Sequence, residues 1–299
     1  MPQIVGPGVT LASTGRDIFA GGKGLNQSVA AAKAGASVRH VGAIGPDGQL
    51  LLETMTASGV DTSGVLQIDE PSGHAMIQVN EAGQNAIVIH GGANRTLTQA
   101  FIQAALDGLG PGQWVLLQNE INDLDQVIQA AALSPASVAL NLAPADERIS
   151  AYPIELLDLL IVNIAEGQAL VEAKALGAAS TAEDAFLCLA HAYPEIDLVM
   201  TLGDQGLLWH AAGSDQTGRM ETIPVQPVDE TAAGDSFVGY LLASLAQSGD
   251  LAEALAVGTV AGALAVTRAG AAPSVPDQAE VASRLKTPPV SHLSDFPQR

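Results

Sequence analysis

The sequence predicts an α/β protein built on a doubly wound, mostly parallel sheet, with helices on both faces and a small β lid. Short apolar runs alternate with helix-patterned segments along most of the chain. The apolar runs hold few polar residues, as strands do in a parallel sheet that is covered on both faces. One region breaks the alternation, with two β-patterned segments on either side of a turn signal.

The alternation defines the expected elements in chain order. Helices are expected over 24–35, which is rich in alanine, and over 50–58, 127–133, 182–192, 236–246 and 251–267. Strands are expected over 38–44, 114–117, 138–142, 159–163 and 198–202, where the apolar runs are too short for helices. Ligands of such folds bind beyond the carboxyl ends of the strands, so polar residues at those ends are candidate site residues.

The region that breaks the alternation predicts a hairpin. His74–Val79 and Asn85–His90 are β-patterned and flank the turn signal at 81–84. This hairpin is a candidate lid, a candidate dimer edge, or an ordinary peripheral hairpin. The expected organisation has lid segments over 1–20 and 63–92, an α/β core over 21–62 and 93–286, and a frayed tail over 287–299.

Composition disfavours several classes of partner and location. Twelve Lys and Arg against 32 Asp and Glu give a net charge of −20, which repels nucleic acids and anionic membrane surfaces. The single cysteine, Cys188, suits a reducing compartment, and the first ten residues lack the regions of a signal peptide. The apolar run 254–267 is shorter than the ~20 residues of a membrane span. A cytoplasmic protein is therefore expected.

The most specific local pattern is the run of small residues in Asp229-Glu230-Thr231-Ala232-Ala233-Gly234-Asp235, before the helix expected near Ser236. Small residues allow backbone N–H groups to approach a ligand, and a helix N-terminus favours anions. Two interpretations of Asp235 are open. It caps the helix, or its carboxylate lies beside a phosphoryl group that is being transferred.

Three other segments also allow both a ligand-binding and a purely structural interpretation. Residues 21–26 place adjacent glycines at the start of the first helix, which allows backbone contact with a polar ligand or merely starts the helix. Asn163 and Glu166 follow a strand with a spacing that suits either a water-mediated Mg²⁺ or phosphate contact, or a helix cap. The glycine-containing loop 201–206 is either a ligand-binding loop or a tight turn.

In their order and spacing, these segments resemble the ribokinase-like (pfkB) family of carbohydrate kinases, from about Gly6 to about Pro276. The two family signatures correspond to 21–35 and 228–239, and smaller markers lie at 90–94, 140–145 and 265–276. The resemblance implies an ATP-dependent kinase that phosphorylates a primary hydroxyl of ribose or a related sugar.

The resemblance also implies a role for each matching residue. Asp235 takes the proton of the sugar hydroxyl, and the amides of Ala232, Ala233 and Gly234 form an anion hole for the phosphate. The sugar-binding residues are Gly22, Lys23, Asn26, Glu120 and Asp235. The nucleotide-binding residues are Asn163, Glu166, Thr201, Leu202, Gly203, Asp204, Gln205, Gly206, Gly234 and Thr259. A monovalent cation such as K⁺ is held by the side chains of Asp229 and Ser274 and the carbonyls of Thr231, Ala265 and Gly270, while Glu166 holds Mg²⁺ through water.

The sequence departs from the family pattern in a few places. Family members begin with a strand carrying a sugar-binding Gly-x-x-Asn-x-Asp segment, whereas Met1 aligns with the loop after it, so reduced sugar affinity is expected. Glu230 replaces a usual Thr, Leu142 a usual Pro, and Thr259 a usual Asn or His. Two alternatives remain: a kinase for a nucleoside, fructose or sugar acid, and a non-catalytic sugar- or nucleotide-binding protein. A homodimer through the lid strands is expected, because the hairpin otherwise exposes a sheet edge.

Overall fold

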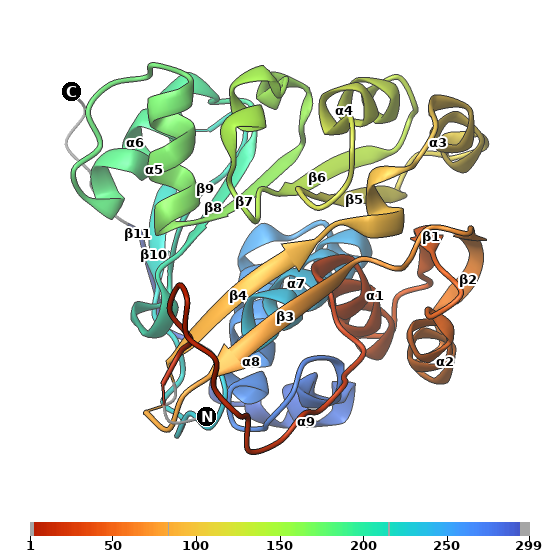
Figure 1. Ribbon diagram of the computed structural model, residues 1–299. Coiled ribbons are helices and arrows are strands. Elements are labelled where there is room, and N and C mark those ends of the chain that lie inside the picture. Colours follow the sequence, from red (N-terminus) through yellow and green to blue (C-terminus); the bar gives the residue numbers. More distant parts are fainter. Residues whose placement is uncertain (1–2, 83, 215, 294–299) are drawn as a thin grey trace.

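The centre of the fold is a seven-stranded sheet with the order β11-β10-β9-β8-β7-β6-β5 (Figure 1). The computed structural model describes residues 3–293 except 83 and 215, so Gly83 of the predicted turn and residues 294–299 of the predicted tail lie outside it. Strands β5 to β8 are parallel, and β8 to β11 are antiparallel. The strands are β5 Trp114–Gln118, β6 Ser137–Asn141, β7 Leu159–Asn163, β8 Asp197–Thr201, β9 Leu207–His210, β10 Thr217–Met220 and β11 Ser291–Leu293.

Helices cover both faces of this sheet, which confirms the predicted fold class (Figure 1). One face carries α3 Gln99–Leu106, α4 Leu124–Ala132, α5 Ile164–Ala173 and α6 Ala182–Ala192, and the other carries α1 Lys23–Lys33, α7 Ala233–Ser248, α8 Leu251–Ala265 and α9 Gln278–Arg284. Side chains of β7 alternate between the two layers. Leu160 and Val162 pack into the core under α4 to α6, while Leu159 and Ile161 pack against α7 and α8. This double burial explains why the strand sequence is apolar without interruption.

A second, two-stranded parallel sheet pairs β1 Arg39–Ile44 with β2 Asp61–Gln67, which are connected through α2 Gln49–Ala57. The strand predicted at 38–44 is therefore present, but in the described residues it belongs to a sheet separate from the central one. The boundary predicted between residues 62 and 63 falls inside β2.

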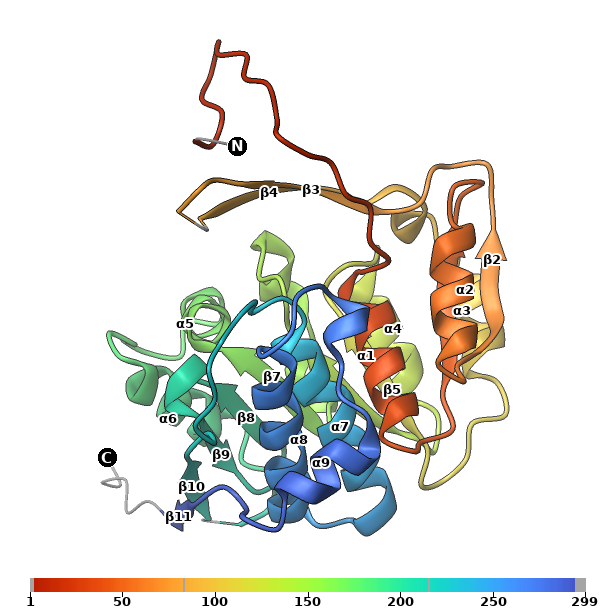
Figure 2. The same ribbon diagram turned by 90° about the horizontal axis from the view of Figure 1, so that it is seen from below.

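The predicted hairpin is confirmed. β3 His74–Val79 pairs antiparallel with β4 Asn85–His90. It stands away from the helical layers, and the N-terminal segment runs beside it (Figure 2). The backbone N–H of Val5 donates to Gln78 Oε1 at 2.9 Å, which ties the two together. Both faces of the hairpin leave large apolar side chains more than half exposed, among them Ile77, Ile87 and Val88.

Three local features differ from the sequence-based expectations. Helix α7 begins at Ala233 rather than near Ser236, because Ala232 takes a left-handed conformation (φ 60°) at the N-cap. Part of the tail expected to be frayed forms β11 against β10. Short 3₁₀ helices occupy Gly92–Arg95, Glu147–Ala151, Ile154–Leu156, Gly203–Gln205 and Ala272–Ser274. In the part of the chain that the structure describes, no helix is long and apolar enough to cross a membrane.

Protonation of His40 makes the free energy of unfolding depend on pH. Its Nδ1 lies 2.8 Å from the Ser28 hydroxyl, and burial lowers the pKa of His40 to about 4. Unfolding restores the ordinary pKa of about 6.5, so the unfolded chain binds a proton first as the pH falls. We expect the free energy of unfolding to drop by at most about 3 kcal/mol between pH 6.5 and pH 4 on account of this group.

Urea unfolding at pH 7 and pH 5 measures this loss. The His40→Gln variant keeps an acceptor for Ser28 but cannot titrate, so its stability should change less with pH than that of the wild type. An identical pH dependence in the two proteins would contradict the prediction.

Candidate active site

A cavity of about 220 Å³ opens at the carboxyl ends of β6, β7 and β8, beside the start of α7. This is the place where open α/β sheets bind ligands. Of the residues predicted from the sequence, those lining the cavity are Lys23, Asn163, Glu166, Thr201, Ala232, Gly234 and Asp235. Four predicted segments that are far apart in the sequence thus converge on one site.

The start of α7 presents unpaired backbone donors to this cavity. Within the described residues, no hydrogen bond uses the amide of Ala232 or Gly234, and both residues line the cavity. The third predicted amide, that of Ala233, instead donates to the Glu230 carbonyl at 3.2 Å. Free N–H groups at a helix N-terminus favour a bound anion.

Asp235 is held from the side of α1. Asn26 Nδ2 donates to Asp235 Oδ2 at 2.8 Å, and Gln27 Nε2 donates to Asp235 Oδ1 at 2.9 Å. Asp235 is the third residue of α7, the helix has no side-chain cap, and the residue is 8% exposed. The capping interpretation is therefore wrong, and a buried carboxylate lies directly beside the free amides.

The predicted sugar-binding residues gather where α1 begins and β5 ends. The Lys23 backbone N–H donates to Glu120 Oε2 at 3.2 Å, and burial raises the pKa of Glu120 although the Lys23 charge opposes the shift. Asn26 is 4% exposed, and its Oδ1 has no hydrogen-bond partner. A buried acceptor without a donor is expensive unless a ligand supplies one. Gly22 takes φ 102° at the N-cap of α1, a conformation that favours glycine.

On the nucleotide side, Asn163 and Glu166 form a capping box. Asn163 Oδ1 accepts from the Glu166 N–H, and Glu166 Oε2 accepts from the Asn163 N–H, both at 2.9 Å. Asn163 and Glu166 therefore cap α5 and also line the cavity. Burial raises the pKa of Glu166, against the effect of the Asn163 hydrogen bond and the Lys23 charge.

Residues 202–206 and Thr259, which were also predicted for the nucleotide, do not line the cavity. Thr201 lines it, whereas 202–206 form the turn beyond β8, closed by the Leu202 N–H donating to the Gly206 carbonyl at 2.8 Å. Gly206 has φ 87°, and a Cβ there would lie 2.0 Å from the Met220 carbonyl oxygen. The Thr259 hydroxyl is buried in α8 and donates to Met220 Sδ at 3.5 Å.

The residues predicted for a monovalent cation come together behind the loop. Asp229 Oδ1 accepts from the Thr231 N–H at 2.9 Å, and Asp229 Oδ2 accepts from the Gly270 N–H at 2.8 Å. Ser274 Oγ lies 3.4 Å from the Thr231 carbonyl oxygen. Burial acts to raise the pKa of Asp229, but these hydrogen bonds outweigh it and keep the pKa below its ordinary value. The carbonyl of Ala265 accepts from the Arg268 N–H at 3.2 Å.

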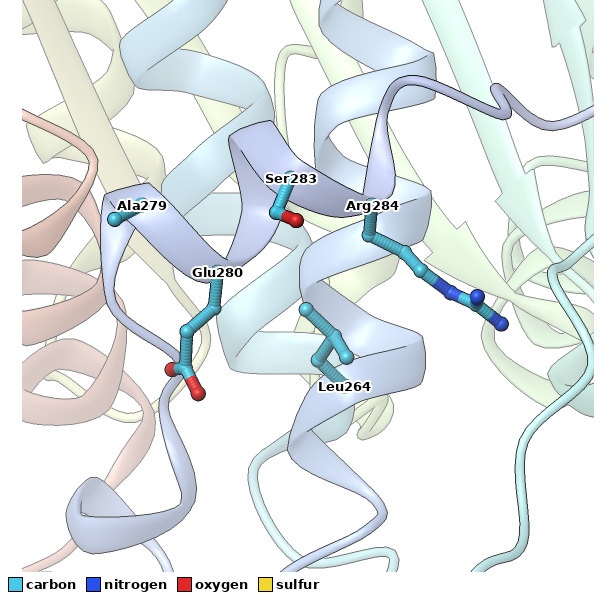
Figure 3. A pocket seen from close by; sticks show the side chains of 5 residues that line it. All are labelled: Leu264, Ala279, Glu280, Ser283 and Arg284. Carbon is cyan, nitrogen blue, oxygen red and sulfur yellow. The ribbon is translucent and has the colours of Figure 1, made fainter.

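A shallow hollow of about 520 Å³ lies elsewhere, between α8 and α9 (Figure 3). Its charged side chains already have partners. Glu280 pairs with Arg268, and Arg284 donates to the Pro224 carbonyl at 3.3 Å. Figure 3 shows Glu280 and Arg284 pointing in different directions, so they do not converge on a common ligand position.

Sequence reasoning missed several side chains that shape the site. Gln27 and Asn141 hydrogen-bond with each other behind Asp235, and Asn141 also lines the cavity. Glu230 lines the cavity as well. Each of the three adjoins or belongs to a motif described in the sequence analysis. Gln27 follows the predicted Asn26, Asn141 lies inside the marker 140–145, and Glu230 replaces a usual Thr.

The fold and this site define the class of a phosphate-handling α/β protein, and comparison with known proteins gives the family. The sequence profile of the pfkB family carbohydrate kinases matches residues 8–278. The ribokinase of Staphylococcus aureus is 34% identical over 286 residues, covering 92% of this chain and 91% of the relative. The chain belongs to the pfkB family of carbohydrate kinases.

Solved structures agree with this assignment. The ribokinase of Cryptococcus neoformans in complex with ADP has a TM-score of 0.84 and 34% identity, covering 95% of this chain and 94% of that one. The Arabidopsis thaliana ribokinase complexed with ribose and ATP has a TM-score of 0.81 and 27% identity, covering 95% and 93%.

Proposed function

We propose that this protein transfers the γ-phosphate of ATP to a primary hydroxyl of ribose. The observation that carries the proposal is the buried Asp235 carboxylate beside the free amides of Ala232 and Gly234. The relatives described above, one of them complexed with ribose and ATP, support the choice of substrates.

In the proposed reaction, the sugar hydroxyl gives its proton to Asp235 while its oxygen forms a bond to the γ-phosphorus. The bond between that phosphorus and the β–γ bridging oxygen breaks, and ADP leaves with the bond's electron pair. The amides of Ala232 and Gly234 donate to the oxygens of the transferring group, whose transition state depends mainly on positioning and charge stabilisation. Mg²⁺, which Glu166 is proposed to hold through water, neutralises phosphate charge when bound.

A panel of acceptors with coupled ADP detection tests the substrate. Ribose should give a higher kcat/KM than 2-deoxyribose, fructose, a sugar acid or a nucleoside. A higher value for a non-pentose would replace ribose within the same family. Binding without turnover of any acceptor would leave the non-catalytic alternative.

Glu120→Gln is expected to raise the KM for the sugar about tenfold while kcat stays within about threefold. The substitution keeps the shape of the side chain but removes the charge that strengthens a hydrogen bond to a hydroxyl, a difference of about 1.4 kcal/mol. Initial-rate kinetics give both constants, and Glu155→Gln, at an exposed carboxylate, is the matched control. A kcat loss with unchanged KM would contradict the sugar-binding role.

We further propose that Asp229, Thr231, Ala265, Gly270 and Ser274 bind a monovalent cation such as K⁺. The donor set of one carboxylate, a hydroxyl and backbone carbonyls suits such an ion, and the Asp229 and Thr231 loop leads directly into the free amides. Replacing K⁺ by tetramethylammonium should lower kcat by roughly tenfold, because a loosened donor loses part of the ~2.7–4 kcal/mol that it supplies. Unchanged kcat in K⁺-free buffer would contradict the cation site.

The hairpin is proposed as the lid and as the dimer contact. Ile77 and Ile87 lie directly opposite each other, are 54% and 51% exposed, and share a face with the paired Ala75 and Ile89. Such an aliphatic face suits a second copy of the same hairpin, because in the described residues the sheet consists of β3 and β4 alone. Sedimentation equilibrium at micromolar concentration should give the mass of two protomers, and a single-protomer mass would contradict the dimer.

The remaining expectations from the sequence are also proposals. We assign 1–20 and 63–92 to the lid, 21–62 and 93–286 to the kinase core, and a cytoplasmic location. The single Cys188 supports a reducing compartment, and the net charge of −20 opposes nucleic-acid and membrane partners. Asn26 and Gly22 are assigned to the sugar, and 201–206 and Thr259 to the nucleotide.

A further inference from the structure

A chain of hydrogen-bonded side-chain amides leads away from Asp235. Gln27 in α1 is fully buried, Asn141 at the end of β6 is 8% exposed, and Gln118 at the end of β5 is half-buried. These three residues come from three different elements. None of the three is among the residues assigned above to the sugar, the nucleotide or the cation, although Asn141 lines the cavity.

The distances connect them to the carboxylate. Gln27 Nε2 donates both to Asp235 Oδ1 and to Asn141 Oδ1, each at 2.9 Å. Gln118 Nε2 donates to Gln27 Oε1 at 2.7 Å. Every polar atom of the Gln27 side chain is therefore used inside the protein. Asn26 differs, because its Oδ1 remains free for a ligand.

The hydrogen bonds of this chain have a fixed direction. An ionised carboxylate only accepts hydrogen bonds, so the nitrogen of the Gln27 amide must face Asp235. The Gln27 oxygen must then accept, and Gln118 supplies the donor. The orientation of one amide at the end of β5 thus decides whether Asp235 meets a donor or an acceptor.

We propose that Gln27 is a positioning residue for Asp235, and that Gln118 selects the orientation of the Gln27 amide. This inference rests on the proposed function, since it assumes that Asp235 receives the proton of the sugar hydroxyl. With one oxygen held by Gln27 and the other by Asn26, the carboxylate cannot rotate away from the acceptor. Buried groups fixed in this manner keep reacting atoms in a productive geometry.

Gln118→Glu is the sharpest test. A glutamate at this position cannot donate to Gln27 Oε1, so the Gln27 amide turns its nitrogen toward residue 118 and its oxygen toward Asp235. We expect kcat to fall at least tenfold, with the KM for the sugar changed less than threefold. Gln118→Met also loses the donor but does not force the reversal, so its kcat should fall less than that of Gln118→Glu.

Gln27→Met removes the donor to Asp235 directly and should lower kcat at least tenfold. Gln278→Met is the matched control, because Gln278 Nε2 also hydrogen-bonds to the α1 segment, at the Ala34 carbonyl (3.1 Å), but away from Asp235. Its kcat should equal that of the wild type. A kcat within twofold of the wild type in Gln27→Met, or equal losses in Gln118→Met and Gln118→Glu, would overturn the proposal. If Gln27→Met does not fold, the comparison at residue 118 decides.

A measurement without turnover separates this inference from the proposed function. In protein labelled with ¹⁵N-glutamine, the Gln27 side-chain NH₂ should exchange with solvent at least tenfold more slowly than an exposed glutamine amide. That protection should fall in Gln118→Glu. An inactive wild type with a protected Gln27 amide would refute only the proposed function, whereas exchange at the rate of an exposed amide would refute the hydrogen-bond chain.

Discussion

Asp235→Asn is expected to lower kcat by about 10²–10⁴-fold, the range typical of losing a positioned general base. The new amide cannot take the proton of the acceptor hydroxyl. Substrate binding should suffer much less, because the amides of Ala232 and Gly234 remain in place. Steady-state kinetics with coupled ADP detection measure both effects.

The variant should still fold. Asn26 Oδ1 has no partner in the described residues, so the Asn26 amide can rotate and accept from the new NH₂ group. Circular dichroism checks this point, and Asp69→Asn, at an exposed carboxylate, is the matched control. Equal kcat in wild type and variant would falsify the role of Asp235.

Gly239→Ala is expected to damage stability and catalysis together. A Cβ at residue 239 would lie 2.5 Å from Ala30 Cβ and 2.7 Å from the Gln27 carbonyl oxygen, so α1 must move away from α7. Overpacking of this kind lowers the free energy of unfolding by about 1–3 kcal/mol. The same movement pulls Asn26 and Gln27 away from Asp235, so kcat should fall as well.

Urea unfolding and initial rates on the same preparation measure the two effects. Gly110→Ala is the control, since the nearest atom to a Cβ there is Gln113 Oε1 at 3.8 Å, and it should lose neither stability nor activity. Loss of stability with full kcat would show that the position of α1 does not limit the reaction.

The elements with strong local patterns could be predicted from the sequence. The hairpin strands, β7 and α6 match the predicted residues, because alternation, apolar runs and a threonine cap are local signals. The antiparallel strands β9 to β11 were missed. They have four residues or fewer, which leaves little pattern to recognise. β11 also pairs with a strand far along the chain, as Arg219 with His292 shows.

In the site, too, features with a local sequence pattern were predictable and contacts between distant residues were not. The small-residue run at 232–234 is a local pattern, so a helix N-terminus with free amides was predictable there. The exact start of α7 and the hydrogen bond of the Ala233 amide to Glu230 were not. The contact of Gln27 with Asp235 joins residues 208 positions apart, and no local pattern reports it. The left-handed Ala232 could not be predicted either, because alanine has no intrinsic preference for that conformation.

If the hairpin β3–β4 forms the proposed dimer contact, the measured activity depends on the enzyme concentration in the assay. Two strands alone are marginally stable in water, and this pair extends beyond the helical layers. If a second copy of the hairpin packs against it, the lid that it forms over the sugar is stable only at protein concentrations that allow the dimer to form. Specific activity should then decline at nanomolar enzyme and recover at micromolar enzyme, so rates from highly dilute assays understate the turnover of the assembled protein.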